Sequence, residues 1–430
     1  MSARFAGSVG LAAVVAVLAA CGGGHGAEAV KPGLYAFDAS NHSLKLLLAG
    51  KHEREDVSWS SDGKWVASTD IGDFLVDVVR STGGGLRDLD SVSWSPDGKT
   101  VAYSKGERLY VARTDWSRPR LVSGDRESDP LDWSPDGRSL IFGTGRDSSC
   151  CWNKIGVARA DGTGVHLLGT QPSGRPILWS VYSARSSPNG RQIAVSAGLN
   201  SQDDCLCVLN VAHGGVTKLT EDVDSTTPFG WSDDGKGLAF VNEPTIGRSP
   251  VYRVGAAGGK PQSLCPQVCH SAVFSKDGSR VAFVSGPANK PSLWVESVDG
   301  TGLRRIAADM PAVRIVWSPD GRKLGLTLAT PDGKHSSIAV ADLGTNKVTR
   351  FAEGSDNEDV ADLSSDGSMV AFYRAGSDRR PSLWVASTSG GDPVPVMELS
   401  SNPELGPCPH VAWSPKAPIL AIANEACEPD

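Results

Sequence analysis

Residues 316–326 read VWSPDGRKLGL, and close copies of this phrase recur along the whole chain. Clear copies are SWSPDGK at 93–99, DWSPDGR at 132–138 and GWSDDGK at 230–236. With the weaker copies included, the aromatic position of the phrase falls at residues 59, 94, 133, 186, 231, 274, 317, 363 and 413. Repeats separated by 35 to 53 residues indicate a propeller or a solenoid, so the repeat decides the fold.

Each repeat predicts four short strands. An apolar strand ends in Trp-Ser, and the turn that follows leads to a second strand such as TVAYSK (100–105). A third strand such as RLYVARTD (108–115) and a weaker fourth such as RLVSG (120–124) complete the unit. No sustained helical period appears after the N-terminal segment. We therefore predict an all-β chain forming a single β-propeller of four-stranded antiparallel blades, nine by direct count or eight if one repeat is degenerate.

The repeated Asp raises the question of whether it is a catalyst or part of a turn. In SPDG, Pro fixes φ near −65°, Asp favours the next turn position, and Gly accepts the left-handed conformation that follows. Nine equivalent catalysts would serve no chemistry, so we interpret Asp97 and its equivalents as turn residues. The Ser should bond to the turn backbone, and the aromatic residue should pack between blades. The last copy, AWSPKAP at 412–418, has lost Asp-Gly, and its turn should differ.

The W-S-P-D-G-[KR] repeat resembles the TolB-type, WD-like β-propeller repeat, which also occurs in the propellers of prolyl oligopeptidase-class peptidases and of tricorn protease. The resemblance covers about residues 33–425. It implies the propeller fold. By comparison with TolB-like proteins, it also implies a non-catalytic binding or scaffold role in the cell envelope, with a protein or peptide partner.

The two ends of the repeat region each contain half of a blade. Residues 33–40 and 44–50 match a third and a fourth strand, whereas residues 410–414 and 419–425 match a first and a second strand. We expect these four strands to share one blade, which would close the ring and remove free sheet edges.

The N-terminus predicts export. Arg4 precedes an apolar run that is shorter than the roughly 20 residues of a membrane span, as in a secretory signal peptide. Leu18-Ala19-Ala20-Cys21 resembles a bacterial lipobox, which implies cleavage before Cys21 and lipid attachment to it; an uncleaved anchor or an ordinary secreted protein is the alternative. The expected divisions are a signal peptide at 1–20, a flexible tether at 21–32 and the propeller at 33–430. The protein would be held on the periplasmic side of the outer membrane in a Gram-negative cell, or otherwise on the extracytoplasmic surface.

Eight cysteines remain after Cys21, and an even number in an exported chain indicates disulfides. Their spacing does not match zinc motifs, so we expect no metal. We predict Cys408–Cys427 across the last hairpin and Cys265–Cys269 around a small loop. A bond between neighbouring blades should join Cys150 or Cys151 to Cys205 or Cys207, with the pairing left open.

Catalytic and nucleic-acid motifs are missing from the sequence. It contains no G-x-S-x-G, no H-E-x-x-H and no Walker loop, and the repeats leave no length for a hydrolase domain. The net charge of −7 argues against general nucleic-acid binding. We expect no cofactor and no enzymatic activity. The alternative is a propeller enzyme, a lyase or a glycan or peptide hydrolase, with its site in the central channel.

The connections that precede the Trp-Ser strands are rich in acids and should project from one face of the ring. We expect them to form an exposed acidic mouth that attracts a basic partner, although solvated loop charge alone is the competing explanation. The candidate partner-binding residues are Arg54, Glu55, Asp56, Glu127, Asp129, Asp224, His270, Arg314, Glu358, Asp359 and His410. Because the loops should be exposed, neutral amides at the acids are expected to leave folding nearly intact.

Overall fold

The computed structural model describes residues 33–424 apart from short gaps. The gaps are 51–53, 71–72, 74, 125–127, 147–151, 170–177, 179, 201–202, 222, 224–226, 243–249, 266, 288, 331–332, 352–356, 376–380 and 400–409. Within the described residues the chain forms strands and turns and no helix. The all-β expectation is therefore confirmed.

The strands follow one another in groups of four along the chain. In chain order they are β1 (Gly33–Asp38), β2 (Ser43–Ala49), β3 (Arg54–Trp59), β4 (Trp65–Asp70), β5 (Leu75–Arg80), β6 (Arg87–Leu89), β7 (Ser91–Trp94), β8 (Thr100–Lys105), β9 (Arg108–Arg113), β10 (Arg120–Ser123), β11 (Asp129–Trp133), β12 (Ser139–Arg146), β13 (Trp152–Arg159), β14 (His166–Leu168), β15 (Ser180–Ser186), β16 (Gln192–Asn200), β17 (Asp203–Asn210), β18 (Val216–Thr220), β19 (Phe229–Trp231), β20 (Gly237–Val241), β21 (Val251–Gly255), β22 (Gln262–Ser263), β23 (Cys269–Phe274), β24 (Arg280–Ser285), β25 (Ser292–Ser297), β26 (Arg304–Ala307), β27 (Ala312–Trp317), β28 (Lys323–Ala329), β29 (Ser336–Asp342), β30 (Val348–Arg350), β31 (Asn357–Leu363), β32 (Met369–Ala375), β33 (Ser382–Ser387), β34 (Val394–Glu398), β35 (His410–Trp413) and β36 (Ile419–Asn424).

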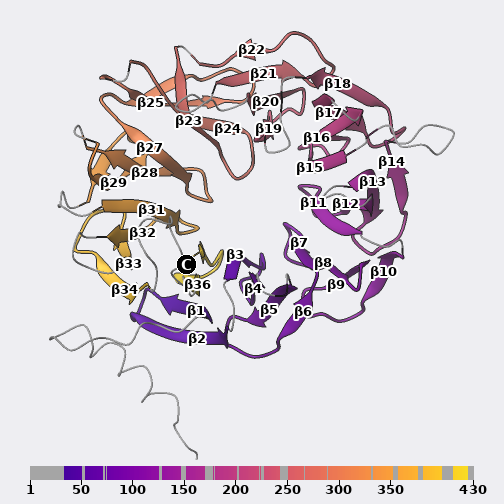
Figure 1. Cartoon of the computed structure of the whole chain (residues 1–430), viewed down its shortest axis with the longest axis horizontal. Coiled ribbons are helices and arrows are strands. Elements are labelled where there is room, and N and C mark those ends of the chain that lie inside the picture. Colours follow the sequence, from indigo (N-terminus) through magenta and orange to yellow (C-terminus); the bar gives the residue numbers. More distant parts are fainter. Residues whose placement is uncertain are drawn as a thin grey trace, which may run out of the picture.

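These strands form a ring of antiparallel sheets, a β-propeller (Figure 1). Five sheets have four strands and two have eight, namely β11–β18 and β27–β34. Each eight-stranded sheet is held across its middle by a single residue pair, Trp152 with Val181 and Ser336 with Asn357. The described residues thus form seven hydrogen-bonded sheets, a number that matches neither nine nor eight, because neighbouring four-stranded units join at these bridges.

The two ends of the chain share one sheet. Its strand order is β2-β1-β36-β35, and β1 pairs antiparallel with β36 from Gly33 opposite Asn424 to Asp38 opposite Ile419. In Figure 1 the indigo N-terminal strands lie beside the yellow C-terminal ones. The predicted ring closure is confirmed, and it leaves neither end of the repeat array as an open edge.

Within each unit the first strand lies nearest the centre of the ring and the fourth lies at the outer rim (Figure 1). Because successive strands are antiparallel, the Trp-Ser turns and the loops between third and fourth strands lie on one face, which we call the turn face. The loops between second and third strands and the links between units lie on the other, which we call the connection face. This geometry decides which side chains can meet.

Three of the seams between units are held by a hydrogen bond from the repeated Trp. The indole Nε1 of Trp59 donates to the carbonyl oxygen of Ala412 at 2.9 Å, and Trp231 and Trp317 donate to Arg185 and Val273 at 3.0 Å. In each case the acceptor belongs to the preceding unit, one residue before its own aromatic position. Trp231 is 1 % exposed. The expectation that this residue packs between blades is confirmed, and the hydrogen bond fixes the distance between neighbouring units.

Two other seams use an Asp at the position just before the aromatic residue. Asp132 accepts from the backbone N–H of Ser186 at 2.7 Å, at a repeat that has Ser in place of Trp. Asp362 accepts from the N–H of Trp413 at 3.2 Å. Burial raises the pKa of Asp362 to about 6, against the opposing effect of the hydrogen bonds from Trp413 and Leu363. These two carboxylates therefore stabilise the contacts between neighbouring units.

Candidate functional site

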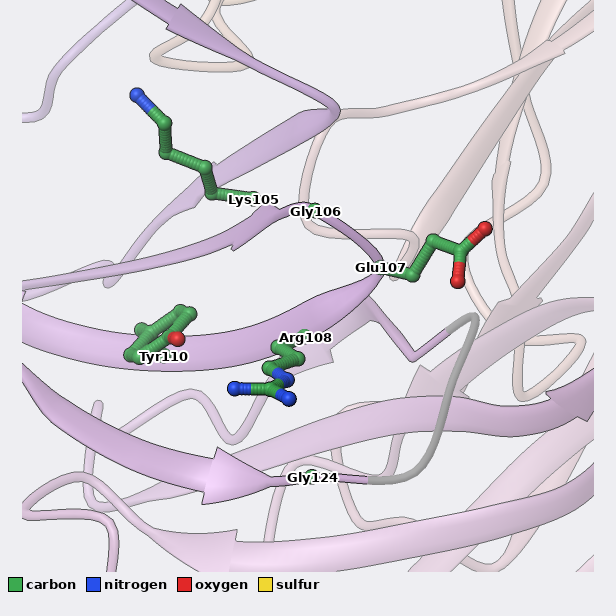
Figure 2. Close-up of a pocket in the computed structure, with 6 residues that line it drawn as sticks. All are labelled: Lys105, Gly106, Glu107, Arg108, Tyr110 and Gly124. Atoms are coloured by element: carbon green, nitrogen blue, oxygen red, sulfur yellow. The ribbon is translucent and has the colours of Figure 1, made fainter.

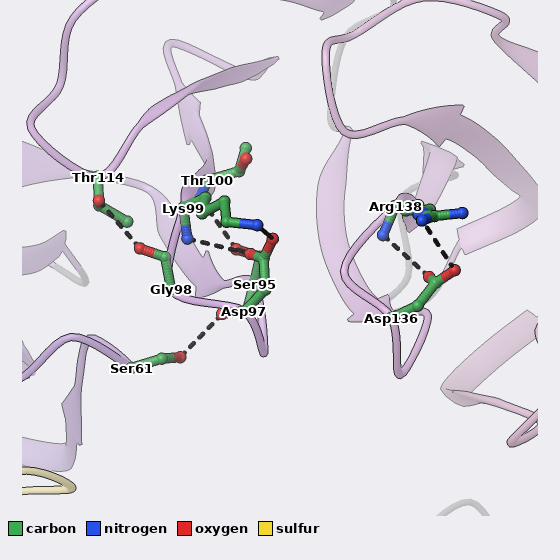
Figure 3. Close-up of polar contacts among 9 residues, drawn as sticks. All are labelled: Ser61, Ser95, Asp97, Gly98, Lys99, Thr100, Thr114, Asp136 and Arg138. Carbon is green, nitrogen blue, oxygen red and sulfur yellow. Dashed lines mark hydrogen bonds and ion pairs between the residues drawn. The ribbon is translucent and has the colours of Figure 1, made fainter.

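The repeated Asp is part of a hydrogen-bonded turn. In the copy shown in Figure 3, Ser95 Oγ donates to Asp97 Oδ1 at 2.8 Å, and Lys99 N donates to the same oxygen at 3.0 Å. Ser95 Oγ in turn accepts from Thr100 N at 2.9 Å, and Gly98 has φ +70°. The same Ser-to-carboxylate or Ser-to-amide bond recurs at 2.5–3.0 Å for Asp62, Asp136, Asn189, Asp234, Asp277, Asp320 and Asp366.

These bonds lower the pKa of six of the turn carboxylates. The hydrogen bonds from Ser134 and from the backbone of Arg138 lower the pKa of Asp136. At Asp97, the hydrogen bonds from Lys99 and Ser95 and the charge of Lys99 outweigh the effect of burial, so its pKa is also lowered. The interpretation of the repeated Asp as a turn residue is confirmed. In the last copy Ser414 Oγ instead accepts from Lys416 N at 3.3 Å, so that turn does differ.

Those predicted partner-binding residues that the structure describes lie at the inner, connection-face ends of the first strands. Two of them form buried ion pairs. Arg54 contacts Asp77 at 2.5 Å and Asp70 at 3.5 Å, and Glu358 Oε1 accepts from Arg374 at 2.6 and 2.9 Å. Arg54 is 2 % exposed and Glu358 is 3 % exposed. The Arg54–Asp70 and Glu358–Arg374 contacts join the start of a first strand to the end of the second strand in the same unit, whereas Asp77 lies on the third strand β5.

A contact between units recurs at the next position of the repeat, one residue after the position of Arg54 and Glu358. Asp129 accepts from Ser91 at 2.9 Å and from Ser104 at 2.6 Å, both in the preceding unit. Asp359 likewise accepts from Arg314 at 2.8 Å and from Thr327 at 2.5 Å. Ser91 and Arg314 occupy the same repeat position, three residues before the aromatic slot, and Ser104 and Thr327 also correspond.

The prediction of a uniformly exposed acidic mouth is therefore wrong for Glu358, which is buried against Arg374. Arg54 is also buried, and Asp129 and Asp359 hold neighbouring units together. The sequence could not show this, because the partner of each residue comes from another strand. The residues that remain at the mouth are Asp56, which is exposed, His410, which is exposed, and His270, which is partly buried. Glu127 and Asp224 lie outside the described residues, as does the side chain of Glu55.

The inner strands carry bulges at these ends. Register shifts occur in β3, β11, β15, β23, β27 and β31. At two of them, Asp56 and Ser271 have φ of +49° and +51°. Bulges beside a pore mouth re-aim side chains. Next to Arg314, Val313 is 58 % exposed, an unusual apolar residue on this rim. Sequence reasoning missed Val313 because it looked only for charge.

Among the residues that the structure describes, no group of three or more His, Cys, Asp or Glu side chains could hold a metal ion. Over the same part of the chain, no helix has the length and apolar character needed to cross a membrane.

Two disulfides are present in the described part of the chain. Cys265 and Cys269 are bonded with their Cα atoms 5.9 Å apart, as predicted. Cys205 and Cys207 are bonded to each other, with Cα atoms 5.8 Å apart. The predicted bond from either of them to a neighbouring blade is therefore wrong, because both lie on the same side of β17 and reach each other first. Cys150, Cys151, Cys408, Cys427 and Cys21 lie outside the described residues.

One hollow on the connection face involves residues that sequence reasoning did not single out. It has a volume of about 500 Å³ and is lined by Lys105, Gly106, Glu107, Arg108, Tyr110 and Gly124. Figure 2 shows Lys105 and Glu107 projecting in opposite directions from the β8–β9 turn, with Arg108 and Tyr110 on β9.

Similarity to known proteins is partial in sequence and broad in fold. No family model matches the chain. Over 87 residues it is 33 % identical to the Tol-Pal system protein TolB of Anaeromyxobacter dehalogenans (strain 2CP-C), a stretch that covers 20 % of this chain and 19 % of that relative. The chain thus matches about a fifth of the length of this curated relative. The resemblance of the repeats to those of TolB is borne out over this stretch.

Solved structures show the same fold over most of the chain. A crystal structure of a eukaryotic initiation factor aligns with a TM-score of 0.52 at 14 % identity, covering 86 % of this chain and 97 % of that one. Porphyromonas gingivalis dipeptidyl peptidase 4 aligns with a TM-score of 0.54 at 12 % identity, covering 81 % of this chain and 60 % of that one. At such low identities the likeness concerns the propeller fold alone.

Proposed function

We propose that this protein is a non-catalytic binding or scaffold protein of the cell envelope, which holds a protein or peptide partner on the connection face of its propeller. The observation that carries the proposal is the 87-residue match to a Tol-Pal system protein TolB, in a chain built throughout from repeats of that kind. The match is partial, so the partner is proposed by its chemistry only.

The connection-face mouth supports the proposal. Asp56 and His410 are exposed on β3 and β35, two first strands that contact each other. On the same part of the ring, separated from β35 only by the unit β31–β34, Val313 stands exposed beside the partly exposed Arg314–Asp359 pair. An apolar residue flanked by charges and by bulged strands suits a protein contact better than a small-molecule pocket.

The proposal includes a lipid anchor at the N-terminus. A lipid on Cys21 would tether the propeller to the membrane, on the periplasmic side of the outer membrane or on the extracytoplasmic surface. Multiple acyl chains would be needed for stable attachment.

We also infer nine blades, since each eight-stranded sheet divides into two four-stranded units at a single bridge.

The alternative is a propeller enzyme with its site in the central channel. Such a site needs several unengaged acids, bases or nucleophiles that converge. Glu358, Asp129 and Asp359, at the inner strand ends, are instead bonded to partners within the protein. This favours a binding role.

The test is capture of a partner from solubilised envelopes, followed by binding kinetics at low and high salt. The variant Asp56→Asn/Asp309→Asn removes two exposed acids from the connection face. The matched control, Asp233→Asn/Asp392→Asn, removes two exposed acids from the turn face. We expect slower association for the first variant only, most clearly at low salt. Equal association rates for both variants would overturn the assignment of the face, and turnover in a glycan and peptide screen would overturn the non-catalytic role.

A further inference from the structure

Trp116 adopts a backbone conformation that is unfavourable for its residue type. It lies in the loop between β9 and β10 with φ +65°, and its N–H donates to the carbonyl of Arg113 at 2.7 Å. Loops with the same three-residue bond place glycine there, namely Gly83, Gly162, Gly258, Gly300 and Gly390. A left-handed conformation costs a side-chain-bearing residue about 1 kcal/mol or more. Such strain is found where a side chain has a task.

The indole of Trp116 forms part of an aromatic wall. Its ring centroid lies 5.7 Å from Trp65, 6.0 Å from Trp94 and 5.4 Å from Tyr103. Tyr103 stacks on Tyr110 across the β8–β9 pair at 5.4 Å. These rings are therefore continuous along the seam between the unit β3–β6 and the unit β7–β10.

Beside this wall the seam opens into a groove. A hollow of about 280 Å³ is lined by Leu86, Arg87, Asp88, Leu89, Tyr103, Lys105, Trp116 and Pro119. Lys105 lines both this hollow and the one in Figure 2. The groove thus runs from the turn face, at Trp116, to the connection face, at Lys105 and Arg108. Its size suits one or two small rings and not a folded partner.

Three cations, Arg87, Lys105 and Arg108, line the groove against two acids, Asp88 and Glu107, in a protein that is acidic as a whole. Arg87 stacks over the Trp116 ring at 4.5 Å, and Lys105 and Arg108 are exposed. Neither Lys105 nor Arg108 forms an ion pair with another described residue. Glu107, the nearest acid along the hairpin, projects away from Lys105 (Figure 2). Against a net charge of −7 for the chain, this local positive charge selects an anion.

We propose that this groove is a binding site for a six-membered ring that bears a carboxylate. The ring would pack against the aromatic wall of Tyr103, Tyr110 and Trp116, and the carboxylate would accept hydrogen bonds from Lys105 and Arg108. Two sources share this chemistry, a uronic acid of a glycan and an aromatic acid. The site is separate from the proposed partner mouth, since it lies at the outer part of one seam.

The experiment is calorimetric titration of the full propeller with D-glucuronate and with benzoate, using D-glucose and benzyl alcohol as uncharged partners. We expect saturable binding of at least one acid and none of the uncharged compounds; the tighter acid identifies the source. Lys105→Gln/Arg108→Gln should weaken binding about tenfold or more. The control Arg159→Gln, at an exposed cation of the next unit, should bind as the unaltered protein does.

A second variant tests the aromatic wall. Trp116→Gly places in this loop the residue that the equivalent loops contain, so the backbone should be retained while the ring is lost, and binding should weaken about tenfold. Two results would overturn the proposal: no saturable binding of either acid, or unchanged binding by Lys105→Gln/Arg108→Gln. Binding of the uncharged sugar as tightly as its acid would do the same.

Discussion

Glu358 and Asp359 are neighbours in the sequence, yet the structure assigns them different energetic roles. Glu358 is 3 % exposed, and both Arg374 Nε and Nη2 donate to its Oε1, at 2.9 and 2.6 Å. Arg374 also stacks over Trp384 at 4.5 Å. Asp359 pairs with Arg314, but these side chains are 33 % and 42 % exposed.

Glu358→Gln should therefore be strongly destabilising, although it changes little in shape. It leaves the Arg374 guanidinium largely buried without a countercharge, which costs about 3 kcal/mol, the lower end for a broken buried pair, since Arg374 keeps some exposure. Arg314→Gln, which breaks the more exposed pair, should cost less than about 1 kcal/mol. The measurement is equilibrium urea unfolding followed by tryptophan fluorescence, with coincident probes to establish a two-state transition.

A charge exchange sharpens this test. In the unit β3–β6, Arg54 occupies the repeat position of Glu358, and Asp70 occupies that of Arg374, so the fold accepts the opposite polarity. The double variant Glu358→Arg/Arg374→Glu should recover at least half of the stability lost in Glu358→Gln. If Glu358→Gln loses no more stability than Arg314→Gln, the reasoning from burial is refuted.

Four other predictions concern the anchor, the seams and the turns. Cys21→Ala should leave a larger, unlipidated precursor in the host, and soluble, processed, unlipidated wild-type protein would contradict the lipobox. Gly230→Ala should cost more than about 2 kcal/mol, because the new Cβ would overlap the carbonyl oxygen of Gly278, whereas Gly98→Ala has no non-neighbouring atom nearer than 3.5 Å and should cost about 1 kcal/mol through its positive φ; equal urea midpoints would contradict this. Asp362 has a folded-state pKa of about 6, above its unfolded value, so the native state holds the proton more tightly and wild-type stability should fall as the pH rises from about 4 to 6. Asp362→Asn should lack this fall and gain about 3 kcal/mol over wild type by pH 7, and parallel pH profiles would count against it. Non-reducing peptide mapping should find Cys205–Cys207 and Cys265–Cys269, and free thiols at these four positions would contradict the structure.

The repeat itself determined the architecture. Turn residues and strand alternation are local properties, since φ at Pro and Gly and the Ser–Asp bond involve residues within one short segment. The propeller, the turn role of Asp97 and the shared closing sheet could therefore be derived from the sequence. The Cys265–Cys269 bond was predictable for the same reason, because it spans only a few residues.

Contacts between strands far apart in the sequence were decided by the tertiary structure alone. Whether Glu358 is an exposed acid or part of a buried ion pair depends on Arg374 and on the strands that cover it. Neither can be read from the residues next to Glu358 in the sequence. The groove at Trp116 exists because two units leave space at the outer part of their seam. Charge patterns along a chain show where ions can be placed, but packing between units determines which of them solvent, a partner or a neighbouring strand will reach.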